Sequence, residues 1–175
     1  EAQTIAAIVI LIVDDNPTNL KVLAQTLKDL GYRSLVAPNG EVAINILEKS
    51  KPDLILLDIN LPGMNGYQVC EKIKTSMPEA AEIPIIFLSA LDDVESKTKG
   101  FKVGGVDYIS KPFHKEEVDM RVKTHIKIAQ LQNKLSSQNS TLENHNQELS
   151  KVLNMLEEKN LVISQTMEEL SSTNE

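Results

Sequence analysis

The sequence lacks tryptophan, and aromatic residues make up only 3% of it, so any core must be built from aliphatic side chains. Its one cysteine, Cys70, excludes a disulfide framework and a thiolate metal site, and it favours a reducing compartment such as the cytoplasm. The apolar run at 4–13 is about half as long as a membrane span. We therefore expect a buried strand there and no membrane-spanning segment.

Neither a G-x-G-x-x-G nor a Walker sequence occurs, which argues against a nucleotide-binding fold. Residues 1–127 carry 15 basic and 18 acidic side chains, and residues 128–175 carry 3 and 7. Both parts are thus acidic, and we predict no binding to nucleic acid. Because the chain begins at Glu1 and not at methionine, we expect a fragment of a longer protein.

Short aliphatic runs alternate with segments of helical length. The runs are IVILIV at 8–13, YRSLVA at 32–37, LILL at 54–57, IIFLS at 85–89 and VDYI at 106–109. Continuous aliphatic strands separated by helices predict a doubly wound α/β fold, with a parallel sheet and binding at the carboxyl ends of its strands. The first helix has clear boundaries, with Asn16 as N-cap, Pro17 at the first position and Gly31 just past the end.

A heptad repeat replaces this alternation in the last part of the chain. Apolar residues fall seven apart at Ile128, Leu135, Leu142, Leu149, Leu156, Ile163 and Leu170. If these are d positions, the a positions are Gln132, Asn139, Asn146, Leu153, Asn160 and Met167. Asparagine at a with leucine at d favours a parallel two-stranded coiled coil, so we predict a homodimer through residues 128–170. The alternative is a single amphipathic helix that folds back on the domain or frays in solvent.

Carboxylates follow two of the predicted strands. Asp14 and Asp15 come after the first strand and Asp58 after the third, and the usual right-handed order makes these strands neighbours. Carboxylates in one crevice either share a proton or hold a divalent cation. Because only oxygen ligands are near, Mg²⁺ is the natural cation.

Two further groups end the fourth and fifth strands. Ser89 offers a hydroxyl, and Lys111 offers a positive charge for the carboxylates or for an incoming anion. Taken singly, each residue could be an ordinary cap, turn or surface residue. Their joint placement at strand ends favours a functional site.

The segments LIVDDN, LLDINLPGMNG, LSA and DYISKPF resemble the response regulator receiver family over residues 7 to about 127. The resemblance implies a flavodoxin-like five-stranded parallel sheet in the order 2-1-3-4-5. We expect a receiver domain over 1–127, and a long coiled-coil helix over 128–175 that continues its fifth helix. The implied function is a phosphoacceptor switch of a two-component phosphorelay, with a sensor histidine kinase or a phosphotransfer protein as donor.

The resemblance also assigns roles to the acidic residues. It makes Asp58 the phosphoacceptor, Asp15 a direct Mg²⁺ ligand and Asp14 a supporting ligand, and Asn60 lends its backbone carbonyl to the metal. These roles fit the chemistry, because phosphoryl transfer needs positioning and charge neutralisation more than covalent assistance.

The same resemblance assigns the remaining site residues. Ser89 is similar to the hydroxyl that contacts the phosphoryl group, Lys111 to the lysine that pairs with it, and Tyr108 to the aromatic switch. Pro112 is expected to follow a cis peptide bond. We expect phosphorylation to turn Tyr108 inward and to act through the fifth helix on the coiled coil, which reports to an output module.

Two other functions remain open. A Mg²⁺-dependent hydrolase could use Asp58 as covalent nucleophile, but hydrolases of this kind resemble each other in carrying a second acid where this sequence has Asn60. A phosphorylation-independent interaction module would depend on the coiled coil alone. For the chain as given we predict an acceptor domain and not an enzyme.

Some polar residues receive only structural interpretations. Cys70 is expected to fill the core from the third helix. His114, His125 and His145 are too scattered for a metal site, and His125 and His145 are predicted to lie on a helix surface or in the coil seam.

Overall fold

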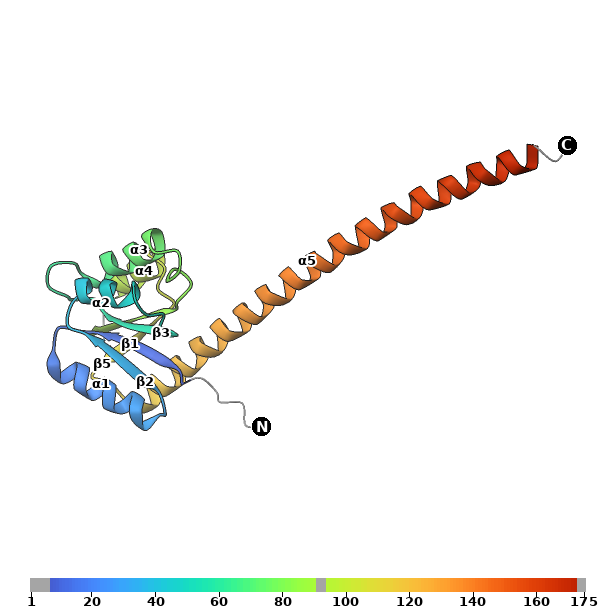
Figure 1. The fold of residues 1–175 in the computed structure, drawn as a ribbon. Coiled ribbons are helices and arrows are strands. Elements are labelled where there is room, and N and C mark those ends of the chain that lie inside the picture. The colour runs from blue at the N-terminus through green and yellow to red at the C-terminus, as the bar shows by residue number, and fades with distance from the viewer. Residues whose placement is uncertain (1–6, 91–93, 173–175) are drawn as a thin grey trace. The chain divides into compact units, whose positions relative to one another are not determined.

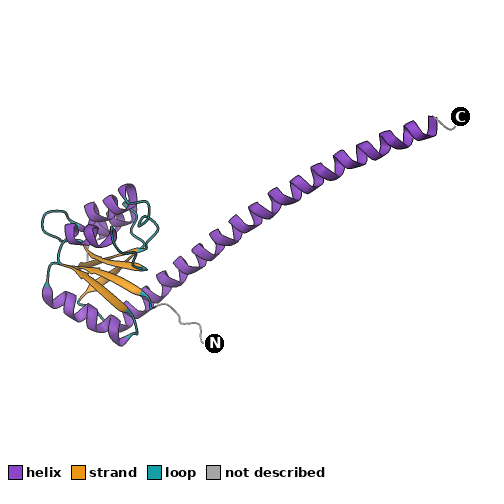
Figure 2. Cartoon of the chain, in the orientation of Figure 1, coloured by secondary structure: helices purple, strands orange, loops and turns teal. Residues whose placement is uncertain are grey.

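The computed structural model describes residues 7–90 and 94–172, in which helices and strands alternate. In chain order they are β1 (Val9–Val13), α1 (Pro17–Asp29), β2 (Arg33–Ala37), α2 (Gly40–Leu47), β3 (Leu54–Asp58), α3 (Gly66–Ser76), β4 (Ile85–Ala90), α4 (Val94–Lys102), β5 (Asp107–Lys111) and α5 (Lys115–Ser172). The strands form one parallel sheet in the order β2-β1-β3-β4-β5 (Figures 1 and 2). The predicted doubly wound fold and its strand order are confirmed.

The boundaries of α1 follow from the residues that its sequence places there. The side chain of Asn16 accepts a hydrogen bond from the backbone N–H of Thr18 at 2.8 Å, and Pro17 is the first helical residue. Gly31 follows the helix with a φ of 87°, a conformation that favours glycine. The three predicted boundary residues are therefore confirmed.

The sheet has an aliphatic core on each face, because alternate strand residues point in opposite directions. One face packs against α2 and α3, and its buried residues include Leu11, Ile55, Phe87, Val69 and Ile73. The other packs against α1 and the first turns of α5, and its buried residues include Ile12, Leu56, Leu23, Val118 and Val122. Both faces are covered, as continuous aliphatic strands predict.

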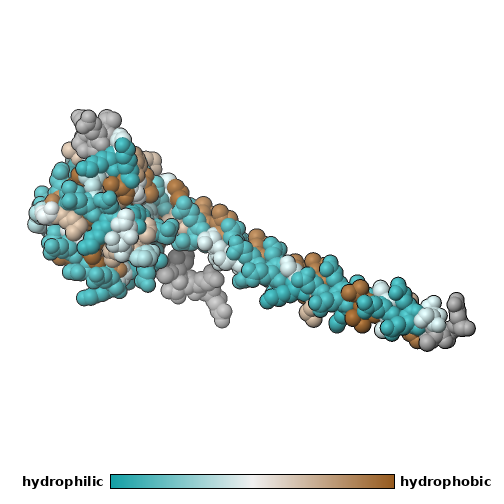
Figure 3. All heavy atoms as spheres, turned by 90° about the horizontal axis from the view of Figure 1, so that it is seen from above, coloured by the Kyte–Doolittle hydropathy of each residue, from teal (hydrophilic) through white to brown (hydrophobic). Residues whose placement is uncertain are grey.

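The chain divides into two compact units, residues 1–129 and residues 130–175. In the second unit every described residue is exposed, including the leucines of the heptad repeat. Leu135, Leu149 and Leu170 are 59%, 60% and 65% exposed. Hydrophobic side chains recur among hydrophilic ones along this helix (Figure 3). The predicted long helix is confirmed, and its pairing with a second helix stays a prediction. Within the described ranges, no helix is both long and apolar enough to cross a bilayer.

Cys70 is fully buried on α3, and the peptide bond before Pro112 is cis, so both predictions are confirmed. The prediction for His125 is wrong. Its side chain is only 13% exposed, and Nε2 lies 2.8 Å from Oδ2 of Asp107. His125 thus ties α5 to β5.

Candidate functional site

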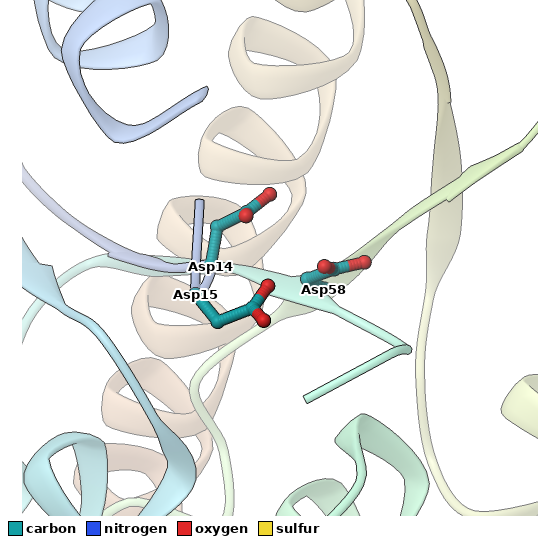
Figure 4. Close-up of side chains that lie close together, drawn as sticks. All are labelled: Asp14, Asp15 and Asp58. Carbon is teal, nitrogen blue, oxygen red and sulfur yellow. The ribbon is translucent and has the colours of Figure 1, made fainter. Parts of the chain in front are cut away.

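The carboxyl ends of four strands bring the predicted side chains together. Because β1 and β3 are neighbours, Asp14 and Asp15 lie beside Asp58 (Figure 4). Each of the three offers a carboxylate oxygen, and these oxygens all lie within 4.8 Å of one another. Asp14 and Asp58 are buried, whereas Asp15 is exposed. The sequence-based expectation of one acidic crevice therefore agrees with the geometry.

Asp14 is fixed by hydrogen bonds to the start of α1. Its Oδ1 accepts from the backbone N–H of Asn16 at 2.8 Å, and its Oδ2 accepts from the side-chain amide of Asn19 at 3.0 Å. Sequence reasoning identified Asn16 as the cap but missed Asn19. The available signal was its position in the first turn of a helix that begins directly after the acidic pair.

Lys111 forms ion pairs with both buried carboxylates. Its Nζ lies 3.0 Å from Oδ2 of Asp14 and 3.0 Å from Oδ2 of Asp58. Burial would lower the pKa of Lys111, but its hydrogen bonds to Asp58 and Asp14 raise it above the usual value. Lys111 is therefore a fixed cation at the centre of the site.

The buried environment of Asp58 disfavours the charged form of its carboxyl group. Burial raises the pKa of its carboxyl above the usual value, although Lys111 favours the charged form. The backbone N–H of Asn60 makes a long contact of 3.4 Å with Oδ1. A cation bound beside Asp58 would therefore stabilise the negative charge of this buried carboxylate.

Ser89 lies on β4, between the strands that carry Asp58 and Lys111. The residue is 6% exposed, and within the described part of the chain its hydroxyl has no hydrogen-bond partner. A buried hydroxyl without a partner costs free energy, so such groups often serve a ligand. This donor fits an incoming anion at the same strand ends.

Tyr108 lies on β5 three residues before Lys111, next to Phe87 in the register of β4 and β5. It is 5% exposed, and its ring centroid is 5.5 Å from that of Phe87. Tyr108 thus lies in the inward position in this structure, and the expected inward turn on phosphorylation stays a prediction. Tyr108 is not a member of the acidic cluster.

A second polar cluster was missed from the sequence. Asp107, at the start of β5, accepts from Arg121 at 2.7 Å and lies 2.8 Å from His125, both on α5. Burial would raise the pKa of Asp107, but its bonds to His125, the Tyr108 backbone and Arg121 lower it. No sequence spacing reveals this cluster, because it depends on how α5 crosses β5.

The acidic crevice has the donors that a hard divalent cation requires. Asp14, Asp15 and Asp58 offer carboxylate oxygens only. The cluster contains no nitrogen or sulfur ligand that would favour a softer metal. These residues therefore fit Mg²⁺.

Residues 10–123 match the family described as the response regulator receiver domain. The chain is 41% identical over 134 residues to a Vibrio cholerae protein named probable cyclic di-GMP phosphodiesterase, covering 77% of this chain and 30% of that protein. It is 38% identical over 114 residues to the probable transcriptional regulator ycf27 of Guillardia theta, covering 65% and 43%. The chain spans less than half the length of these curated relatives.

Solved structures show the same fold. The chemotaxis protein CheY4 of Vibrio cholerae is 28% identical, with a TM-score of 0.65 over 68% of this chain and 98% of that one. The receiver domain of the Francisella response regulator 1452 is also 28% identical, with a TM-score of 0.62 over 68% and 96%. The acidic cluster, Ser89 and Lys111 all lie within residues 10–123, the range matched by the family.

Proposed function

The chain belongs to the response regulator receiver family of two-component signalling, and we propose that Asp58 is its phosphoacceptor. The observation that carries the proposal is the contact of Asp58 with Lys111 inside a crevice that also holds Asp14 and Asp15. The donor is a phosphohistidine of a sensor histidine kinase or a phosphotransfer protein. Cys70 as the single, buried thiol agrees with a location in the reducing cytoplasm.

The reaction is a transfer between two nucleophiles. A carboxylate oxygen of Asp58 attacks phosphorus, the P–N bond of the phosphohistidine breaks, and its electron pair leaves with the imidazole. Lys111 holds Asp58 in the charged form that attacks, and it then offers its ammonium group to the new phosphoryl oxygens. The buried Ser89 hydroxyl gains an acceptor in the same group.

Asp15, Asp58, the backbone carbonyl of Asn60 and, in support, Asp14 are the residues proposed to hold Mg²⁺. When bound, Mg²⁺ would neutralise charge on the phosphoryl oxygens and bring donor and acceptor into line. Asp14 is already committed to Asn16, Asn19 and Lys111. This agrees with a supporting role, and the exposed Asp15 remains open to solvent for direct coordination.

A hydrolase is a weaker reading of the same crevice. Such an enzyme needs a proton donor beside the acyl phosphate, and the position two residues after Asp58 holds Asn60, whose amide cannot transfer a proton. We therefore propose an acceptor whose phosphoryl group persists long enough to signal.

We propose that residues 128–175 form a separate coiled-coil unit, which pairs as a parallel homodimer over 128–170 and transmits the signal to an output module. The support is the exposure of its apolar heptad residues, between 43% for Ile128 and 66% for Met167. An apolar stripe of this length is costly in water and is relieved by a second helix. The relatives named as a phosphodiesterase and a transcriptional regulator illustrate two kinds of output. The acidic charge of this chain agrees with a signal-transmitting segment that does not itself contact nucleic acid.

The proposal is tested by incubating the protein with a small acyl-phosphate donor and recording its intact mass. The wild type should gain one phosphoryl group with Mg²⁺ and none with a chelator. Asp58→Asn should gain none, whereas Asp29→Asn, which alters a carboxylate at the far end of α1, should behave as the wild type. Sedimentation of the same samples reports whether phosphorylation changes the oligomer. A wild type that takes up no phosphoryl group would leave the interaction module as the better account.

A further inference from the structure

The ring of Tyr108 is enclosed between the sheet and α4. Phe87 of β4 lies beside it, with ring centroids 5.5 Å apart. Phe101 of α4 meets it edge to face at 5.4 Å, and Tyr67 of α3 packs against Phe87 at 5.3 Å. The tyrosine therefore joins β5 to α4 through an aromatic cluster that belongs to the core of that face.

Two glycines border this aromatic cluster, and the close packing around them leaves no room for a side chain. Gly100 is buried in α4, and Gly105 is buried just before β5. Neither has a positive φ, in contrast to Gly31, Gly63 and Gly104. Any residue could adopt the backbone conformation at 100 and 105, so the requirement for glycine there is steric.

Both glycines face the ring of Phe87, but the hydroxyl of Tyr108 is among the nearest atoms of Gly100 alone. A Cβ on Gly100 would overlap the hydroxyl of Tyr108 and would lie 2.9 Å from Cδ2 and Cε2 of Phe87. A Cβ on Gly105 would overlap Cε2 of Phe87, would lie 2.7 Å from its Cδ2, and would lie 3.1 Å from the carbonyl oxygen of Gly100. The hydroxyl of Tyr108 is thus opposed by Gly100 and not by Gly105.

The end of α4 has little freedom to withdraw from the tyrosine. The carbonyl of Gly100 accepts a hydrogen bond from the backbone N–H of Gly105 at 2.9 Å. The next residue, Val106, donates to the carbonyl of Ile85 on β4, also at 2.9 Å. A side chain at position 100 would therefore displace the Tyr108 ring more readily than the helix.

We infer that Gly100 is the positioning residue of Tyr108, and that its missing side chain admits the phenol to the inward position and couples β5 to α4. A methyl group at this position holds the ring outward. That Tyr108 acts as a signalling switch rests on the proposed function, but its placement by Gly100 does not depend on phosphorylation.

The test uses the full chain labelled with 3-fluorotyrosine. The chain has three tyrosines, Tyr32, Tyr67 and Tyr108, so the ¹⁹F spectrum has three resonances that single Tyr→Phe variants assign. In the untreated wild type, the Tyr108 resonance should show the small solvent isotope shift of a buried ring. In Gly100→Ala it should acquire the larger shift of an exposed ring. In Gly105→Ala, which crowds Phe87 and the Gly100 carbonyl but not the Tyr108 hydroxyl, it should stay buried.

A double-mutant cycle separates this role from simple destabilisation. Tyr108→Phe removes the atom that a Cβ at position 100 overlaps, so Gly100→Ala should lower the urea midpoint less in the Tyr108→Phe background than in the wild type. Gly105→Ala should lower it equally in both. If Gly100→Ala does not fold, the Gly100→Ala/Tyr108→Phe variant should fold. The inference is overturned if the Tyr108 resonance is exposed in the wild type or stays buried in Gly100→Ala. It is also overturned if the double variant stays unfolded or if the coupling free energy between the two changes is zero.

Discussion

Nζ of Lys111 lies 3.0 Å from Oδ2 of Asp58, so the cation that ends β5 reaches the carboxylate that ends β3 across the intervening strand β4. The same ammonium group contacts Asp14 at 3.0 Å. Two buried carboxylates thus depend on one cation that is itself 27% exposed. The charge balance of the crevice is accordingly easy to disturb.

Replacing Lys111 with methionine should destabilise the protein by about 1–3 kcal/mol, because two buried carboxylates lose their counter-charge. Urea unfolding at neutral pH measures this loss. Mg²⁺ should restore part of it by supplying another cation. Lys115→Met, which changes an exposed lysine at the start of α5, should have little effect. Equal losses in the two variants would refute the charge argument.

Asp58→Asn should stabilise the protein in the absence of Mg²⁺, by on the order of 1 kcal/mol at neutral pH, because it removes a charge that burial disfavours. The pKa of Asp58 is raised in the folded state above its ordinary value of 3.8. Charged Asp58 therefore costs stability as the pH rises through the folded value, and the advantage of asparagine should be absent below about pH 3.8 and full at neutral pH. Thermal unfolding across this range measures it. Asp15→Asn, which changes an exposed carboxylate, should raise the stability of the protein less.

Asp107→Asn should destabilise the protein by about 1–3 kcal/mol, because Arg121 and His125 lose a shared carboxylate. The pKa of Asp107 is lowered from 3.8 in the folded state. The wild-type advantage should therefore be full at neutral pH and should disappear as the pH falls through the lower folded value. Urea unfolding at several pH values tests this. Glu117→Gln removes only the other partner of Arg121 and should cost less.

Leu156→Asn should weaken self-association of the chain at least about tenfold, because it places an amide in the apolar seam of the proposed coil. Leu161→Asn is the matched control, since Leu161 is similarly exposed but lies outside the a and d positions. Sedimentation equilibrium over a range of concentrations compares the two. An equal effect of both changes, or a monomeric wild type, would contradict the proposed dimer.

The fold and the acidic crevice were predictable because both depend on local pattern. Aliphatic runs separated by helices specify parallel strands, and parallel strands collect Asp14, Asp58, Ser89 and Lys111 at one edge. The residues at the carboxyl ends of the strands therefore predict the chemistry of the site without knowledge of their contacts.

The contacts that sequence reasoning missed depend on how separate elements pack. Asp107 meets His125, eighteen residues away, only because α5 crosses β5 where it does. The glycine at position 100 is explained by the hydroxyl of Tyr108 on another element. Asn19 reaches Asp14 through the first turn of α1. No periodicity records the first two pairs, since each needs the three-dimensional crossing of two elements, whereas the contact of Asn19 with Asp14 is local and had a signal in the sequence.

The most direct test of the account is to locate the phosphoryl group itself. After incubation with Mg²⁺ and a small acyl-phosphate donor, borohydride reduction converts an aspartyl phosphate to homoserine, which peptide mass spectrometry assigns to a position. We predict homoserine at position 58 alone, and none in protein incubated without donor. Homoserine at position 14 or 15, or at no position in protein that has demonstrably bound Mg²⁺, would contradict the assignment of Asp58 as the phosphoacceptor.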